Sequence, residues 1–404
     1  MTRFVLFTWI TLGWIATTAA EGVWPQFRGP DGQGHASERG LPSKWSETEN
    51  IVWKVPVDGL GWSSPVVANN QIWLTTALDK GHSLRAICLE AANGKKVHDI
   101  QVFQSDDPGG IHTKNSYASP TPVLEGGRVY VHFGDLGTAC LTTEGEVVWR
   151  STELKYNHGH GPAGSPVLYG DLLIVSCDGT DVQYVAALDK RTGEVRWKSE
   201  RQGRMAYSTP LIINVAGQDQ LISTGGNQAV AYEPDSGKEI WRVRYDGYSE
   251  VPRPVYGQGL VFLASGYDTP WLYAVRPDGQ GDVTDSHVAW KMQKGAPLNP
   301  SPLLEGEELY LVSDQGIASC LDAKTGDKHW QKRLPGNYSA SPLLADGKIY
   351  FTNEHGLTTV IELGKEYREL AANQIEGDTL ASLAVLDKAF LLRSGTHLYR
   401  IEEE

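Results

Sequence analysis

The stretch ALDKRTGEVRW, residues 187–197, returns later in the chain as CLDAKTGDKHW, residues 320–330. In both copies a glycine follows a threonine, and a tryptophan stands four positions beyond that glycine. Glycine adopts the positive φ of a tight hairpin without steric cost, so the pattern predicts two short strands joined by a turn. A third copy, AYEPDSGKEIW, covers residues 231–241. The hairpin is therefore a repeated unit of the fold.

A second motif repeats in step with this hairpin, namely a short apolar strand opened by a proline. Its copies are SSPVV, PTPVL, GSPVL, STPLI, PRPVY, PSPLL, ASPLL and the degenerate ASLAV. The proline position falls at Pro65, Pro122, Pro166, Pro210, Pro254, Pro302, Pro342 and Leu383. The average period is about 45 residues, and β-branched or aromatic strands such as LLIVS and KIYFT lie between the two motifs. Four short antiparallel strands in each of eight units predict an all-β, eight-bladed β-propeller.

A tryptophan marks the fourth strand of most units. These residues are Trp53, Trp149, Trp197, Trp241, Trp290 and Trp330. A four-stranded blade cannot bury both of its apolar faces alone, so neighbouring blades must stack, and a ring of this size buries about 150–250 Å². We therefore expect these side chains to dock each blade on its neighbour rather than to bind a cofactor or a nucleic acid.

The last unit supplies only three strands, LASLAV, KAFLLR and THLYRI. The missing outer strand has a candidate near the other end of the chain, NIVWKV at residues 50–55, which carries Trp53. We predict that this strand completes the last blade and removes an exposed sheet edge. The propeller then spans residues 50–404, and residues 21–49 form an N-terminal lead-in segment.

Residues 1–20 have the pattern of a cleavable signal peptide, because Arg3 precedes an apolar run from Phe4 to Ala16 and small residues end at Ala20. The alternative is a membrane anchor, but the run is shorter than the roughly 20 residues that span a bilayer core. No cysteine lies near the cleavage site, so no lipid anchor is expected. We expect a soluble, monomeric protein of the periplasm or the extracellular space, without a transmembrane span after cleavage.

The composition excludes several classes of protein. The 404 residues carry 49 acidic and 36 basic side chains, a net charge of -13, which repels phosphate backbones and anionic lipids. We therefore expect no nucleic-acid partner. The 44 glycines and 21 prolines imply frequent turns, which argues against helical bundles and α/β barrels.

The four cysteines give no sign of a metal site, because none forms a CxxC pair or a Cys/His cluster. Cys88, Cys140 and Cys320 share the contexts AICL, TACL and ASCL, which predict equivalent buried strand positions. A disulfide between Cys140 and Cys177 is the alternative in an exported protein.

The hairpin copies resemble the A-x-D-x-x-T-G-x-x-x-W repeat of the PQQ-like, or quinoprotein-type, propeller family, and weaker copies cover most of residues 50–401. The stretch WPQFRGPDGQG, residues 24–34, resembles the lead-in of exported family members. One branch, the quinoprotein dehydrogenases, holds pyrroloquinoline quinone (PQQ) and calcium beneath a vicinal disulfide, and this chain has no adjacent cysteines. The resemblance is greater to the second branch, that of the outer-membrane assembly factor BamB, which is exported and carries no cofactor.

In such a propeller, the residues before each innermost strand gather at one mouth of the central channel. The expected ligand or partner contacts there are Trp62, Tyr117, His158, His160, Tyr207, Arg253, Asn299 and Tyr338. An aromatic and amide-rich funnel suits a small planar or sugar-like ligand or a peptide loop, and the alternative is a water-filled channel. His158 and His160, two apart on an extended segment, should point the same way. No third ligand accompanies them, so no metal site is expected.

No GxSxG, P-loop, HExxH or SxxK motif stands where its mechanism requires it, so no catalytic residue is assigned. The sequence therefore predicts an exported, non-enzymatic scaffold that binds proteins of the bacterial cell envelope and needs no cofactor. The alternative is a reduced quinoprotein-type oxidoreductase that uses PQQ and calcium, or a small-ligand-binding propeller that uses the funnel.

Overall fold

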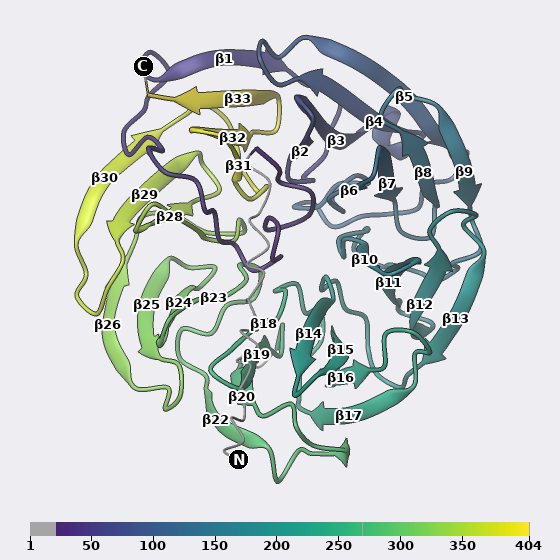
Figure 1. The fold of residues 1–404 in the computed structure, drawn as a ribbon, viewed down its shortest axis with the longest axis vertical. Helices are drawn as coiled ribbons and strands as arrows, with labels where there is room; N and C mark the ends of the chain where they lie inside the picture. The colour runs from purple at the N-terminus through teal and green to yellow at the C-terminus, as the bar shows by residue number, and fades with distance from the viewer. Residues whose placement is uncertain (1–21, 269, 404) are drawn as a thin grey trace, which may run out of the picture.

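The computed structural model describes residues 22–268 and 270–403. These residues form eight sheets arranged in a ring around a central axis, as Figure 1 shows. Each sheet has four antiparallel strands, and one sheet gains a fifth strand in parallel pairing. The predicted all-β, eight-bladed propeller is confirmed. The predicted signal peptide, residues 1–20, lies outside the described residues.

We number the blades in chain order and give the strands of each from the axis outward. Blade 1 consists of β2 (Val66–Ala68), β3 (Gln71–Leu78), β4 (Ser83–Glu90) and β5 (Lys96–Gln104), with a 3-10 turn at Asp79–Gly81. Blade 2 consists of β6 (Val123–Glu125), β7 (Arg128–His132), β8 (Thr138–Thr142) and β9 (Val147–Ser151). Blade 3 consists of β10 (Val167–Tyr169), β11 (Leu172–Asp178), β12 (Gln183–Asp189) and β13 (Val195–Glu200). Blade 4 consists of β14 (Leu211–Val215), β15 (Gln218–Gly225), β16 (Gln228–Tyr232), β17 (Glu239–Arg244) and the extra β21 (Gly281–Asp282).

The second half of the ring repeats this order. Blade 5 consists of β18 (Val255–Gly257), β19 (Leu260–Ala264), β20 (Leu272–Val275) and β22 (Val288–Met292). Blade 6 consists of β23 (Leu303–Glu305), β24 (Glu308–Val312), β25 (Ile317–Asp322) and β26 (Lys328–Arg333). Blade 7 consists of β27 (Leu343–Ala345), β28 (Lys348–Thr352), β29 (Leu357–Glu362) and β30 (Glu369–Gln374). Blade 8 consists of β31 (Ala384–Leu386), β32 (Ala389–Arg393), β33 (His397–Glu402) and β1 (Ile51–Pro56).

An early strand and a late strand of the chain pair in blade 8. Strand β1 pairs antiparallel with β33, with Trp53 opposite Arg400 and Val55 opposite Leu398. The prediction that an N-terminal strand closes the ring is therefore confirmed. Closure leaves no exposed edge between the first and the last blade.

The repeated tryptophans fasten each outer strand to the next blade. The indole Nε1 of Trp149 in blade 2 donates a hydrogen bond of 3.1 Å to the Lys190 carbonyl in blade 3. Equivalent bonds run from Trp53 to Ala91, from Trp197 to Pro234, from Trp290 to Ala323 and from Trp330 to Gly364. A ring that is packed and also hydrogen-bonded fixes both the spacing and the register of adjacent blades.

Three blades depart from this pattern at the same register position. Trp241 is fully buried and donates instead to Gln220 within its own blade, where β21 covers the outer strand. Blade 1 carries His98 at the docking position, opposite Cys88, and blade 7 carries Ala371. In the described part of the chain, five blades therefore dock on a neighbour through an indole hydrogen bond, and the other three do not.

All four cysteines are buried and free, so the alternative of a Cys140–Cys177 disulfide is wrong. Cys88, Cys140 and Cys320 each stand opposite the docking residue of their blade, namely His98, Trp149 and Trp330. Their shared sequence context thus reflects one repeated packing position.

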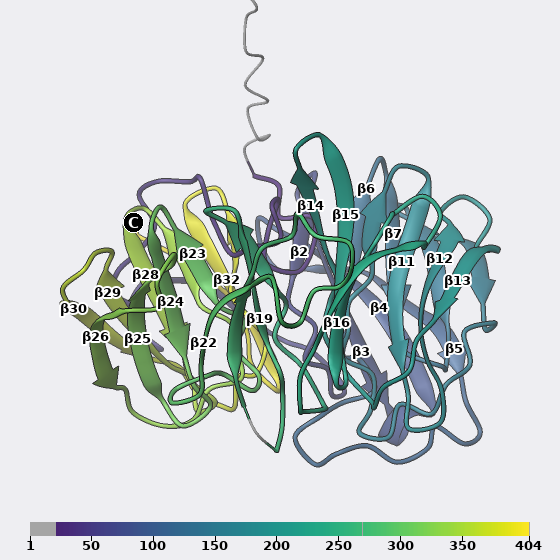
Figure 2. The ribbon, with the colours of Figure 1, turned by 90° about the horizontal axis from the view of Figure 1, so that it is seen from below.

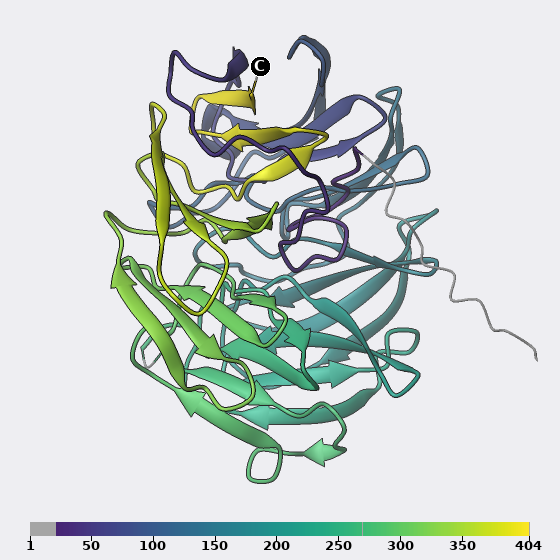
Figure 3. The same cartoon turned by 60° about the vertical axis from the view of Figure 1, so that its left-hand side comes forward.

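The lead-in segment crosses the centre of the ring before it enters β1, as Figures 1 and 3 show. Trp24 exchanges backbone hydrogen bonds of 2.9 and 2.8 Å with Val67, and the Arg28 guanidinium donates to the Pro302 carbonyl over 2.6 Å. Other bonds join the segment to Leu124, Tyr256 and Leu344. We call residues 24–36 the plug, because they contact the innermost strands of five blades and close one end of the channel.

Apolar side chains fill the spaces between blades, as Trp73 and Ala86 of blade 1 do with Leu124 and Val131 of blade 2. Figure 2 shows the blades from the side, with the turns of each sheet at the two faces of the ring. Within the described ranges, no helix has the length and apolar character needed to cross a membrane.

Candidate functional site

The end of the channel opposite the plug opens into a funnel with a cavity of about 570 Å³. Its lining comes from every blade-to-blade connection that precedes an innermost strand, and Phe27 of the plug contributes to the floor. Because the plug closes the other end, the channel is a blind pocket with one mouth. A cavity of this size falls in the range of small-molecule sites.

A ring of hydroxyl groups forms the floor. The residue before the proline position is Ser or Thr in seven blades, and all seven side chains are buried and line the cavity: Ser64, Thr121, Ser165, Thr209, Ser301, Ser341 and Ser382. Each hydroxyl accepts the backbone N–H of the equivalent residue in the preceding blade over 2.9 to 3.1 Å. These bonds hold the innermost strands in a circle around the axis.

Arg253 occupies the eighth position of this ring. It has no hydroxyl to offer to the Thr209 N–H, and its guanidinium turns toward the plug, where Nε donates to the Pro210 carbonyl and Nη1 to the Phe27 carbonyl. Arg253 is 2% exposed, so it anchors the plug to the floor rather than lining the funnel.

One wall of the funnel is aromatic. The rings of His160 and Tyr207 stack at 5.9 Å between centroids, and Tyr248 meets Tyr267 edge to face at 5.7 Å. Tyr207 is held in place because its hydroxyl donates to the His158 carbonyl over 2.6 Å. These side chains come from the connections around blades 3 to 5, and Trp62 lines the cavity from the connection before blade 1.

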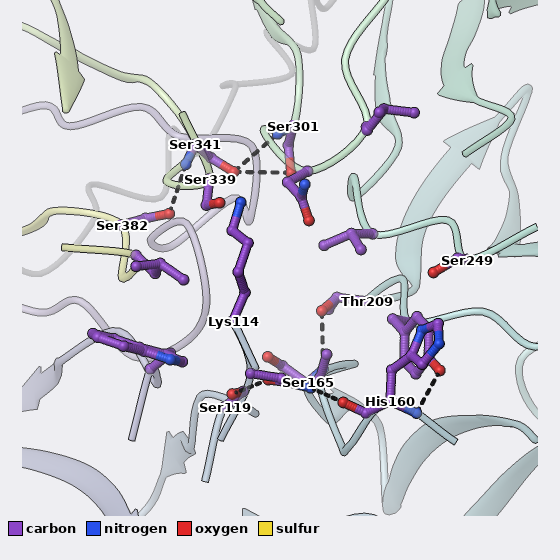
Figure 4. A pocket seen from close by; sticks show the side chains of 18 of the residues that line it. Lys114, Ser119, His160, Ser165, Thr209, Ser249, Ser301, Ser339, Ser341 and Ser382 are labelled. Carbon is purple, nitrogen blue, oxygen red and sulfur yellow. Dashed lines mark hydrogen bonds between the residues drawn. The ribbon is translucent and has the colours of Figure 1, made fainter. Parts of the chain in front are cut away.

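A lysine reaches across the funnel. Figure 4 shows the Lys114 side chain extending through the cavity toward Ser339. Its Nζ lies 2.6 Å from Glu354 Oε1, which also accepts a hydrogen bond of 2.7 Å from Ser339. Lys114 belongs to the connection before blade 2 and Glu354 to blade 7, so this ion pair joins opposite parts of the mouth.

The floor is surrounded by buried positive charge. Arg28, Arg253 and Arg393 are each 2% exposed, and none forms an ion pair within the described ranges. Burial lowers the pKa of Arg28 and Arg393 to about 9 and that of Arg253 to about 10. The charge of Arg253 contributes to the lower pKa of Arg28.

The predicted funnel residues fall into two groups. Trp62, His160, Tyr207 and Asn299 line the cavity. Four others lie elsewhere: Tyr117 donates to the Gly109 carbonyl, His158 is buried 3.3 Å from Asp135, Arg253 holds the plug, and Tyr338 is fully buried between blades. His158 is therefore buried beside Asp135 whereas His160 lines the cavity, so the two imidazoles do not point into the same site.

Other lining residues were not among the predicted ones. They include Lys114, His112, Tyr248, Tyr267 and the seven hydroxyls of the floor. The Ser or Thr before each proline position is visible in the repeat itself, so this part of the site had a signal in the sequence. Tyr248 and Tyr267 come from loops without a repeated pattern.

The donor set does not fit a quinone and calcium centre. Calcium takes carboxylate and carbonyl oxygens, whereas no Asp or Glu of the described ranges lines the cavity. Nor do residues 22–268 and 270–403 contain three His, Cys, Asp or Glu side chains grouped to hold a metal ion. The four cysteines lie inside the blades, away from the funnel.

The family is shown by sequence. The family model described as "Outer membrane protein assembly factor BamB" matches residues 43–200, 181–280 and 271–374, which together cover most of the chain. The chain therefore belongs to this family of PQQ-like repeat propellers.

Curated relatives include members of both branches. The outer membrane protein assembly factor BamB of Burkholderia pseudomallei is 23% identical over 67% of this chain and 69% of its own length. That of Shewanella oneidensis is 24% identical over 54% of this chain and 57% of its own length. The dehydrogenase subunit of the quinone alcohol dehydrogenase of Gluconobacter oxydans is 22% identical over 62% of this chain, but the match spans only 34% of that subunit.

Solved structures share the fold. BamB from Moraxella catarrhalis superposes with a TM-score of 0.60 at 14% identity, over 87% of this chain and 97% of its own. A europium-containing methanol dehydrogenase gives a TM-score of 0.69 at 12% identity, over 93% and 90%. At these identities the likeness concerns the architecture alone.

Proposed function

We propose that this propeller is an exported, non-enzymatic scaffold that binds envelope proteins, as the names of its BamB relatives suggest for them. The observation that carries the proposal is an apolar arc on the outer wall. Val52, Val97 and Val148 are 52%, 45% and 41% exposed, and they lie on the outermost strands of blades 8, 1 and 2. Figure 1 shows β1, β5 and β9 side by side along one part of the rim.

The three valines share one structural position. Each is the residue directly before the docking residue of its blade, at the point where the register of the outer strand shifts. Such a bulge turns a side chain away from the sheet, so the apolar group faces solvent. Three exposed valines thus recur at equivalent positions of adjacent blades, and we take this row of apolar side chains as the contact surface. Blade 3 carries Arg196 at the equivalent position, which ends the arc.

The blades that carry the arc are joined at two radii, which suits this role. Bonds of the hydroxyl ring join them at the axis. Farther out, the Trp53 indole joins blade 8 to blade 1, and the Arg150 guanidinium of blade 2 donates to the Val102 carbonyl of blade 1. The net charge of -13 favours a partner that is basic around its own apolar contact.

The test uses the full chain as bait in cross-linked envelope extracts. The double variant Val97→Lys/Val148→Lys should lose the partner that the wild type captures, because two charges then face the apolar contact. Val182→Lys is the matched control, since Val182 is 42% exposed in a turn between β11 and β12, away from the arc. Loss of the partner from the control as well, or retention in the double variant, would refute the arc as the binding surface.

The quinoprotein alternative has a direct test of its own. Reconstitution with PQQ and calcium, followed by a dye-linked alcohol or sugar assay, should give no turnover if the proposal holds. Turnover that disappears on removal of the quinone would favour the oxidoreductase.

A further inference from the structure

The funnel floor is a set of hydrogen-bond donors. Each ring hydroxyl already accepts a hydrogen bond from a backbone N–H. The main interaction left to it is therefore to donate its own proton. Ser341 donates to Ser301. Within the described part of the chain, the hydroxyl protons of the other six have no acceptor in the protein: Ser64, Thr121, Ser165, Thr209, Ser301 and Ser382. A hydroxyl that accepts a hydrogen bond also becomes a stronger donor.

Positive charge adjoins these donors. Arg253 is a member of the ring, Arg28 donates to the Pro302 carbonyl next to Ser301, and Arg393 donates to Ser63 next to Ser64. Among the described residues, Asp31 is the carboxylate whose charge acts on Arg28 and Arg253, and it is held by His35. A buried cation without a carboxylate partner is costly, so a negative charge at the floor would offset this cost.

The upper part of the funnel offers a different chemistry. The stacked rings of His160 and Tyr207 line this part, and Tyr248 lines it with the Arg204 guanidinium over one face of its ring. The Asn299 amide is fixed because its Nδ2 donates to Asp314. The carbonyl oxygen of Asn299 and the hydroxyl of Ser249 are then available to a ligand. Lys114 Nζ reaches across the mouth to Glu354.

We propose that the funnel binds a small sugar acid of the hexuronate class, with its carboxylate on the hydroxyl floor and its ring against the aromatic wall. The floor hydroxyls supply the donors for the carboxylate, and the buried guanidinium groups behind the floor add positive charge. The pyranose C–H face packs on the tyrosine and histidine rings, and the ring hydroxyls meet Asn299, Ser249 and Lys114. This site goes beyond the scaffold function and does not depend on it, because the apolar arc lies on the outer wall.

Isothermal titration calorimetry of the full chain with D-glucuronate at constant ionic strength tests the site, with D-glucose as the neutral counterpart. Glucuronate should bind and glucose should bind at least about tenfold more weakly, since the carboxylate carries the main polar contacts. Equal binding of the two sugars, or binding of neither, would overturn the proposal. If sodium chloride or sulfate displaces glucuronate at equal concentration, the floor is a general inorganic-anion site and the assignment to a sugar acid is wrong.

Two variants with opposite expected effects separate ligand contact from folding. Lys114→Met should weaken glucuronate binding about tenfold, because it removes the cation at the mouth. Glu354→Gln should tighten binding severalfold, because it frees Lys114 from its carboxylate partner. Lys324→Met is the matched control, since Lys324 pairs with Glu307 on the outside and both are exposed. If Lys114→Met and Lys324→Met behave alike, or if Glu354→Gln weakens binding, the proposed ligand position is wrong.

Discussion

The backbone N–H of Ser382 donates a hydrogen bond of 3.1 Å to the hydroxyl of Ser64, although 318 residues separate the two along the chain. This bond joins blade 8 to blade 1 at the axis. The indole of Trp53 joins the same two blades farther out, through its bond of 3.1 Å to the Ala91 carbonyl. The ring is therefore closed at its inner and at its outer radius by separate contacts.

Trp53→Ala should lower the free energy of unfolding by about 3–5 kcal/mol, because it removes a buried ring and its hydrogen bond at the closing blade. Urea unfolding followed by tryptophan fluorescence and circular dichroism measures the change. Val52→Ala is the control on the same strand, since Val52 is 52% exposed, and its effect should stay within about 0.5 kcal/mol. Equal effects of the two variants would contradict the role given to the indole.

Gly193→Ala should destabilise the protein more than Gly217→Ala does. Both glycines have positive φ, at 80° and 88°, so an alanine costs about 1 kcal/mol of backbone strain at either place. At Gly193 the new Cβ would also lie 2.5 Å from the Trp149 ring, whereas nothing lies within 4 Å at Gly217. We expect an additional loss of about 1–3 kcal/mol from this clash, measured by thermal and urea unfolding. Equal losses would mean that the glycine is required only for its φ.

Arg253→Ser should loosen the plug while the blades stay intact. The variant loses the bond to the Phe27 carbonyl but gives the Thr209 N–H a hydroxyl of the kind found in the other blades. Hydrogen exchange should therefore become faster at residues 24–36 and stay unchanged in the inner strands. Arg244→Ser provides the comparison, because the Arg244 side chain is 56% exposed on the outer wall. Unchanged exchange in the plug would show that Arg253 does not anchor it.

The anchoring of the plug should depend on pH through His35 and Asp31. Burial lowers the pKa of His35, but the hydrogen bond and the charge of Asp31 outweigh this effect and hold the pKa above its usual value. Burial likewise raises the pKa of Asp31, and the contacts with His35 outweigh it, so the pKa is lowered. The stabilisation from His35 is therefore complete below about pH 6.5 and is lost as the pH rises through the folded-state pKa. The contribution of Asp31 to stability is present above about pH 4 and is lost as the pH falls through its folded-state pKa.

His35→Gln should accordingly cost more stability at pH 5.5 than at pH 8.5, measured as the difference in unfolding free energy from the wild type. Glu305, whose carboxylate lies 3.8 Å from His35, acts in the same direction. His355→Gln, at a side chain that is 72% exposed, is the surface control and should change the unfolding free energy by no more than about 0.5 kcal/mol. A cost for His35→Gln that rises with pH would contradict the assignment.

The repeat made the architecture predictable, because a period of about 45 residues, a proline-led strand and a docking tryptophan are all local patterns. Even the closure by β1 could be inferred from a missing fourth strand. The role of His98 could not be inferred. It stands at the position where other blades carry tryptophan, but a histidine does not match the repeated motif.

The site was less accessible to sequence reasoning. A residue that directly precedes an innermost strand lies near the funnel, but the sequence does not show in which direction its side chain points. Tyr338 turns into the space between blades and Arg253 turns toward the plug, whereas Tyr207 and Asn299 face the cavity. Lys114 and Glu354 are 240 residues apart, so only the three-dimensional ring shows that they meet.

The pairing of β1 with β33 has a consequence for the order of folding. Strand β1 is synthesised early and must wait for β33, which is synthesised much later, and contacts of such long sequence separation form slowly. Until His397–Glu402 is available, Trp53 lacks the strand that positions it beside Ala91. A nascent chain can stack its middle blades, but it closes into a circle only once the residues of β33 have been translated.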